Sequence, residues 1–184
     1  GAKNIVLCDI GGALYVGADG INDAQSAMAA VTNKNNEKGN LAEVMKGKDV
    51  FIGVSAPNIV TKEMVASMAD KSIVFAMANP TPEIMPDLAL EAGAFIVGTG
   101  RSDFNNQVNN VLAFPGIFRG ALDVRASDIN EEMKLAAAYA IANTLDESEV
   151  SRDFVIPFAF DKRVGKNVAE AVKQAAIKSG VARI

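Results

Sequence analysis

The chain has 184 residues, 49% hydrophobic and 22% charged, a composition typical of a folded globular domain and unlike that of a disordered or fibrous chain. With 18 basic and 22 acidic residues the net charge is −4, so we expect no nucleic-acid partner. The absence of histidine excludes Ser-His-Asp catalysis and histidine-bound zinc. The one cysteine, Cys8, excludes an internal disulfide and is expected to be a buried structural thiol in a reducing compartment.

The length of the chain predicts one domain, residues 1–184. No apolar run reaches the roughly 20 residues that cross a bilayer. The first residues also lack the composition of a signal peptide. We therefore expect a cytoplasmic protein that has no membrane partner.

Short apolar runs alternate with helical patterns over the first hundred residues. Strands are expected at 4–9, 50–54, 73–78 and 94–98, and helices at 22–31, 41–45, 62–68 and 86–93. This alternation predicts right-handed βαβ crossovers and a parallel sheet that is buried on both faces. Further helical patterns follow at 129–145 and 164–178. The fold class expected is therefore α/β, a doubly wound Rossmann-like parallel sheet followed by C-terminal helices.

Asp9 stands at the end of the first expected strand, where ligands of open parallel sheets bind. A carboxylate in this position can accept hydrogen bonds from the ribose hydroxyls of a dinucleotide, or it can merely begin a turn before Gly11 and Gly12. The glycine-rich phosphate loop belongs about 20 residues before such an acid, but only eight residues precede Asp9. We interpret the chain as lacking the first βα unit, which carries that loop.

The connection after the fourth expected strand is rich in amide side chains. It contains Asn105, Asn106, Gln107, Asn109 and Asn110. A carboxamide offers a donor and an acceptor without charge, which suits a carboxylate ligand or the carboxamide of nicotinamide. The alternative is a turn whose asparagines only cap the helix that follows.

Longer sequence motifs resemble those of a known family. These are FIGVSAP at 51–57, ANPTPEI at 78–84, GRSDF at 100–104 and NNVLAFPGIFRGALDV at 109–124. In this order, and over nearly the whole chain, they are similar to the NAD-binding domain of bacterial malic enzymes. One departure is Asn105, which stands where the family commonly has proline and which loosens the backbone before the Asn-Asn pair.

The resemblance implies a function and a set of site residues. The family converts (S)-malate to pyruvate and CO2 with NAD or NADP and a divalent Mg or Mn ion. Asp9, Ser55, Asn79 and Asn109 would bind the cofactor, and Asn79, Asn109 and Asn110 would bind malate. Which of Asn109 and Asn110 contacts malate stays open. Asp9 favours NAD because a carboxylate repels a 2′-phosphate, and NADP is the alternative.

The family's catalytic tyrosine and lysine, its metal ligands and its glycine-rich loop lie in an amino-terminal region that we expect to be absent here. We therefore expect no catalytic and no metal-ligating residue in this chain, which alone would be inactive. Tyr15 and Tyr139 do not match the family's tyrosine motif. The full-length enzyme is expected to be a homodimer.

Two alternatives stand beside this interpretation. The first is a stand-alone dinucleotide-binding or interaction module without catalysis. The second is another dehydrogenase with a doubly wound domain, although such enzymes do not share the Asn-Asn-Val and Phe-Pro-Gly motifs of this chain.

Overall fold

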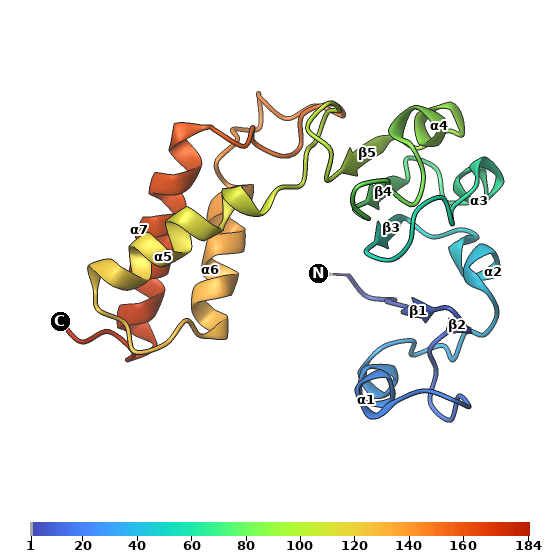
Figure 1. Ribbon diagram of the computed structural model, residues 1–184, viewed down its shortest axis with the longest axis horizontal. Helices are drawn as coiled ribbons and strands as arrows, with labels where there is room; N and C mark the ends of the chain where they lie inside the picture. The colour runs from blue at the N-terminus through green and yellow to red at the C-terminus, as the bar shows by residue number, and fades with distance from the viewer. Residues whose placement is uncertain (1) are drawn as a thin grey trace.

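The computed structural model describes residues 2–184, which form two lobes (Figure 1). The first lobe contains β1 (Cys8–Asp9), β2 (Gly12–Ala13), α1 (Asp23–Val31), α2 (Leu41–Met45), β3 (Val50–Gly53), α3 (Lys62–Ala66), β4 (Ile73–Ala76), α4 (Pro86–Glu91) and β5 (Ile96–Thr99). The second lobe contains the 3-10 helix η1 (Asn110–Leu112), α5 (Phe114–Asp123), α6 (Glu131–Ala142) and α7 (Lys162–Lys178). Each lobe has its own hydrophobic core, and the two cores are formed by separate sets of buried residues.

The first lobe is built on a parallel sheet with the strand order β3-β4-β5. Val74 and Ala76 of the central strand β4 are completely buried, and α3 and α4 form the crossovers between the strands. The predicted α/β fold with C-terminal helices is confirmed. None of the helices within residues 2–184 combines the length and the apolar character that spanning a membrane requires.

The prediction of a buried strand at 4–9 is wrong. Only Cys8 and Asp9 form a strand, β1, which pairs antiparallel with β2 and not with the parallel sheet. Ile5 is 49% exposed and Cys8 is half-buried, because in the described chain no strand of the parallel sheet pairs with this segment. Burial still raises the pKa of the Cys8 thiol, although the nearby Lys48 ammonium opposes this shift.

The outer edge of β3 is unpaired within residues 2–184. Val50 and Ile52 of β3 and Val54 just after it are all exposed, with Ile52 62% exposed, so the prediction that the sheet is buried on both faces is wrong for β3 in the described chain. An exposed apolar strand edge presents free backbone donors and acceptors and pairs readily with another strand.

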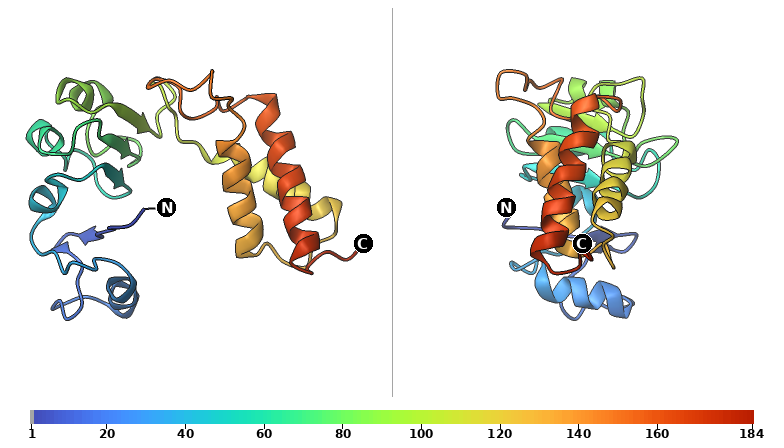
Figure 2. Two further views of the ribbon diagram at one scale, coloured as in Figure 1. Left: turned by 180° about the vertical axis from the view of Figure 1, so that it is seen from behind. Right: turned by 90° about the vertical axis from the view of Figure 1, so that its left-hand side faces the viewer.

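In the second lobe α7 packs against both α5 and α6 (Figure 2). The contact between α5 and α7 is close because Gly116 and Gly120 of α5 face Val168 and Val172 of α7, which are fully buried. A Cβ atom on Gly116 would lie only 2.6 Å from the Cβ atom of Val168. The two helix backbones therefore approach each other to a distance that only glycine permits.

We expect Gly116→Ala to lower the free energy of unfolding by about 1–3 kcal/mol, because the added methyl group overpacks the contact with Val168. Gly165→Ala in α7 is the matched control, since nothing lies within 4 Å of a Cβ at that position. The control should raise stability by about 0.5–1 kcal/mol through helix propensity. Urea denaturation measures both variants, and equal gains in stability would contradict the close approach of the helices.

Candidate functional site

The carboxyl ends of the three parallel strands lie at one edge of the sheet, where Gly53, Ala76 and Thr99 are in register. Ser55 follows β3 and Asn79 follows β4, and both residues are exposed. The two predicted site residues thus lie on neighbouring loops at the same edge of the sheet. The peptide bond between Asn79 and Pro80 is cis.

The carboxylate of Glu83 joins these two loops. Its Oε1 accepts a hydrogen bond from the backbone N–H of Ser55 at 2.8 Å, and its Oε2 accepts one from the N–H of Ala78 at 3.0 Å. Glu83 is completely buried. In the sequence, Glu83 was noted only as part of the ANPTPEI motif and was not predicted to be a site residue. The signal that was missed is an acid that stands between Pro82 and Ile84 without a basic neighbour in that segment.

Asp9 occupies the end of β1 and is exposed, as a ribose-binding carboxylate must be. It also begins a turn, because its Oδ1 accepts the N–H of Ile10 at 2.8 Å. Its Oδ2 accepts a hydrogen bond from the side-chain amide of Gln25, a residue that sequence reasoning did not single out. A ribose hydroxyl at Asp9 would therefore replace or share the hydrogen bond from Gln25.

The two residues of the Asn-Asn pair differ in their surroundings. Asn109 is half-buried and caps η1, because its Oδ1 accepts the N–H of Val111 at 3.0 Å. Asn110 is the first residue of η1 and is exposed. The capping alternative thus applies to Asn109, whereas the amide of Asn110 is the more accessible to a ligand.

Asn106 is buried and connects the two lobes. Its Nδ2 donates to the carbonyl groups of Val97 in β5 and Arg152 in the α6–α7 connection, each at 3.0 Å. Its Oδ1 accepts the N–H of Val155 at 2.8 Å. The φ of Asn106 is 53°, in the left-handed region that asparagine tolerates better than most residues. Asn106 is therefore a structural residue of the amide-rich connection.

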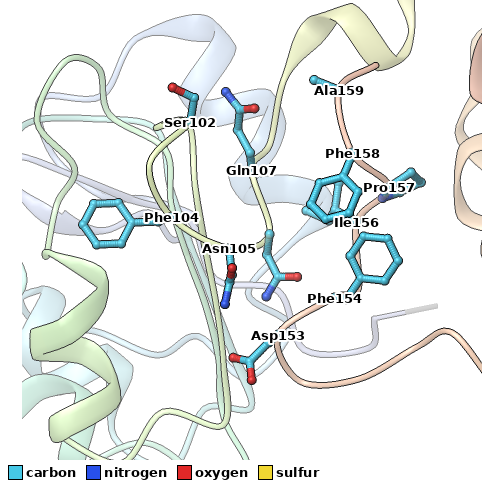
Figure 3. Close-up of a pocket in the computed structure, with 11 residues that line it drawn as sticks. Ser102, Phe104, Asn105, Gln107, Asp153, Phe154, Ile156, Pro157, Phe158 and Ala159 are labelled. Carbon is cyan, nitrogen blue, oxygen red and sulfur yellow. The ribbon is translucent and has the colours of Figure 1, made fainter. Parts of the chain in front are cut away.

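A cavity of about 90 Å³ lies beside Asn106, between the segments 102–107 and 153–159 (Figure 3). The rings of Phe154 and Phe158 are in contact there, with centroids 4.8 Å apart. Pockets for drug-sized ligands measure about 300–1,000 Å³, so this cavity is too small for a dinucleotide. The loops at the sheet edge remain the better candidate site.

Arg101 and Asp103 form a bidentate ion pair. The Nη2 atom of Arg101 lies 2.7 Å from Oδ2 of Asp103, and its Nε atom lies 2.9 Å from Oδ1. The hydrogen bonds from Arg101 lower the pKa of the Asp103 carboxyl. Thr99, at the end of β5, has the one buried side-chain oxygen or nitrogen without a hydrogen-bond partner in the part of the chain described here.

No metal site is formed by the described residues. Within residues 2–184 no three His, Cys, Asp or Glu side chains are grouped so that they could hold an ion. The side chains predicted for the site are different in kind: one carboxylate, Asp9, at the end of β1 outside the parallel sheet, one hydroxyl and several amides. The structure brings the loops of Ser55 and Asn79 together at the sheet edge, whereas Asp9 belongs to the separate β1-β2 pair. The predicted groups match the hydroxyls and the carboxamide of a nicotinamide dinucleotide better than they match a divalent cation.

A parallel α/β sheet with polar loops at its carboxyl edge is the arrangement found in doubly wound nucleotide-binding domains. A family model described as the malic enzyme NAD-binding domain matches residues 1–177. The chain belongs to this family.

Relatives and solved structures agree with the family. The chain is 61% identical over its whole length to a bifunctional malic/malolactic enzyme of Bacillus subtilis, of which it covers 45%. It is 45% identical to an NADP-dependent malic enzyme of Halomonas elongata, with 99% of the chain and 46% of that protein covered. The crystal structure of an NAD-dependent malic enzyme from Thermotoga maritima matches 94% of the chain at a TM-score of 0.87 and 46% identity, and 45% of that structure is covered. The chain thus spans less than half the length of these relatives.

We expect Asn106→Ala to lower the free energy of unfolding by about 2–4 kcal/mol, because three hydrogen bonds disappear and one of the partners, Val97, stays buried. Asn105→Ala is the matched control, since Asn105 is exposed and adjacent. Urea denaturation measures stability, and limited proteolysis reports opening of the segment 143–161. Equal stability of the two variants would show that Asn106 does not hold the lobes together.

Proposed function

We propose that residues 1–184 are the nucleotide-binding domain of an enzyme that oxidises (S)-malate to pyruvate and CO2, with NAD as cofactor and NADP as the alternative. The observation that carries this proposal is the meeting of the Ser55 and Asn79 loops at one edge of a sheet. This edge belongs to a chain that matches the malic enzyme NAD-binding domain over residues 1–177.

Each site residue has a chemical role in this proposal. Asp9 accepts hydrogen bonds from the adenosine ribose, and Ser55 binds the dinucleotide beside it. Asn79 and Asn109 orient the nicotinamide end, and with Asn110 they hold malate through neutral amide groups. When bound, the nicotinamide accepts a hydride from the substrate. In this role Asn79, Asn109 and Asn110 bind and orient malate, because a neutral carboxamide does not exchange protons with it.

We further propose that other parts of a longer protein supply what this chain does not offer. The described residues do not fit a divalent cation, so the metal ligands and the acid–base groups would lie outside residues 1–184. A strand that carries the glycine-rich loop would pair with the exposed edge of β3 and bury Ile52. The complete enzyme would be a cytoplasmic homodimer.

A second candidate reaction is malolactic conversion of malate to lactate and CO2. The relative that is 61% identical is named a bifunctional malic/malolactic enzyme, and this name favours including the reaction in any assay. Malate-dependent formation of NADH or NADPH tests the main proposal, and detection of lactate tests the second. Nucleotide binding without either product would favour a binding module without catalysis.

In the full-length enzyme we expect Asn79→Ala and Asn110→Ala each to raise the KM for malate and to lower kcat. Each amide contact to a charged ligand group is worth roughly 1.5–3 kcal/mol, which corresponds to about ten- to over a hundredfold in affinity or rate. Asn35→Ala, at another exposed asparagine of the first lobe, serves as the control. Wild-type constants for malate in both variants would remove Asn79 and Asn110 from the site.

Asp9→Ala should weaken NAD binding and narrow the preference for NAD over NADP, because the carboxylate no longer repels a 2′-phosphate. Asp19→Ala is a suitable control, since Asp19 is another exposed acid of the same lobe. Steady-state kinetics of the full-length enzyme with both cofactors gives the ratio of kcat/KM. An unchanged ratio in Asp9→Ala would contradict the assignment of Asp9 to the ribose.

A further inference from the structure

Glu83 is a buried carboxylate that has no cationic partner within residues 2–184. Burying such a group is costly unless hydrogen bonds satisfy it. Here each carboxylate oxygen accepts a backbone N–H, from Ser55 at 2.8 Å and from Ala78 at 3.0 Å. The hydroxyl of Ser55 lies 3.5 Å from the same Oε1 atom. The carboxylate is therefore satisfied by the two loops that follow β3 and β4.

The surrounding backbone reinforces this connection. The N–H of Asn58 donates to the carbonyl of Pro82 at 3.1 Å, and the N–H of Val60 donates to the carbonyl of Glu83 at 3.0 Å. The residue at the end of β3 is Gly53, on which a Cβ atom would lie 2.5 Å from the carboxylate carbon of Glu83. The end of β3 thus leaves a space that the carboxylate fills.

The two backbone N–H groups that bind Glu83 lie at the residues whose positions matter most for the proposed function. One belongs to Ser55 itself, and the other belongs to Ala78, the residue directly before Asn79. Ser55 and Asn79 lie on loops that follow different strands, and both residues are exposed, so the positions of their side chains depend on the backbones of these loops. A misplacement of about 1 Å in a binding group can cost about a hundredfold in rate.

We infer that Glu83 is a positioning residue, which holds the Ser55 and Asn79 loops at the spacing required to bind the dinucleotide and malate together. This inference rests on the proposed function. Glu83 does not touch the ligands and acts through the backbone of the two loops. The carboxyl group of Glu83 suits this role because both of its oxygens accept hydrogen bonds, and each faces a backbone donor.

Glu83→Gln in the full-length enzyme separates this role from general stability. Glutamine has nearly the same shape, but its NH2 group faces one backbone N–H, so one hydrogen bond is lost. We expect kcat/KM for malate to fall about ten- to a hundredfold, mainly through KM, and the Kd for the nucleotide to rise. Gly53→Ala should give the same pattern by displacing the carboxylate, and it keeps the test valid if Glu83→Gln does not fold.

Two controls accompany these variants. Glu91→Gln makes the same chemical change at an exposed glutamate of α4 and should leave the kinetics unchanged. Val65→Ala removes packing from the core beneath the sheet, so it should lower Tm without raising KM. Wild-type kinetic constants in Glu83→Gln would overturn the inference. It would also be overturned if Val65→Ala, at an equal loss of Tm, raised KM equally.

Hydrogen exchange distinguishes failure of this inference from failure of the proposed function. The N–H groups of Ser55 and Ala78 should exchange faster in Glu83→Gln than in the wild type, whereas those of β4 should not change. If the N–H groups of Ser55 and Ala78 exchanged equally fast in Glu83→Gln and in the wild type, the inference would be overturned whatever reaction the enzyme performs. A wild-type enzyme that neither reduces NAD(P) with malate nor forms lactate would overturn the proposed function alone.

Discussion

The hydrogen bonds of Glu83 determine the geometry on which the proposed site depends. A parallel sheet aligns the ends of its strands, but it leaves the loops beyond those ends without a common support. Glu83 supplies this support by accepting the N–H groups of Ser55 and Ala78, and Gly53 leaves room for its carboxylate. The cost of burying the charge is offset by these bonds only while both loops keep their positions.

The proposed site also depends on how the two lobes are joined. Ser55 and Asn79 belong to the first lobe, whereas Asn109 and Asn110 begin the second. The amide of Asn106 bonds to β5 and to the α6–α7 connection, so it fixes the segment that precedes the Asn-Asn pair. The proposed ligand-binding residues would thus be held in place by the buried side chains of Glu83 and Asn106, which act through the backbone and do not contact the ligand.

Local patterns predicted most of the fold correctly. The strands expected at 50–54, 73–78 and 94–98 are present as β3, β4 and β5, and the expected helices begin within two residues of their predicted positions. The prediction of a buried strand at 4–9 failed because an apolar run becomes a buried strand only when a neighbouring strand pairs with it. For Asp9, the sequence left open whether the residue begins a turn or presents a carboxylate to a ligand. The structure shows that it begins a turn and that its exposed carboxylate also accepts a hydrogen bond from Gln25.

The sequence by itself determined the α/β class, the family and the places of Ser55 and Asn79 after neighbouring strands, because strand periodicity and family motifs are contiguous in the chain. Only the tertiary structure decided which residues hold that edge in place. Ser55 and Glu83 are 28 positions apart, and Asn106 and Arg152 are 46 apart. Their hydrogen bonds form only after the strands and the two lobes have packed. No local pattern encodes which buried carboxylate or amide will meet which distant backbone group.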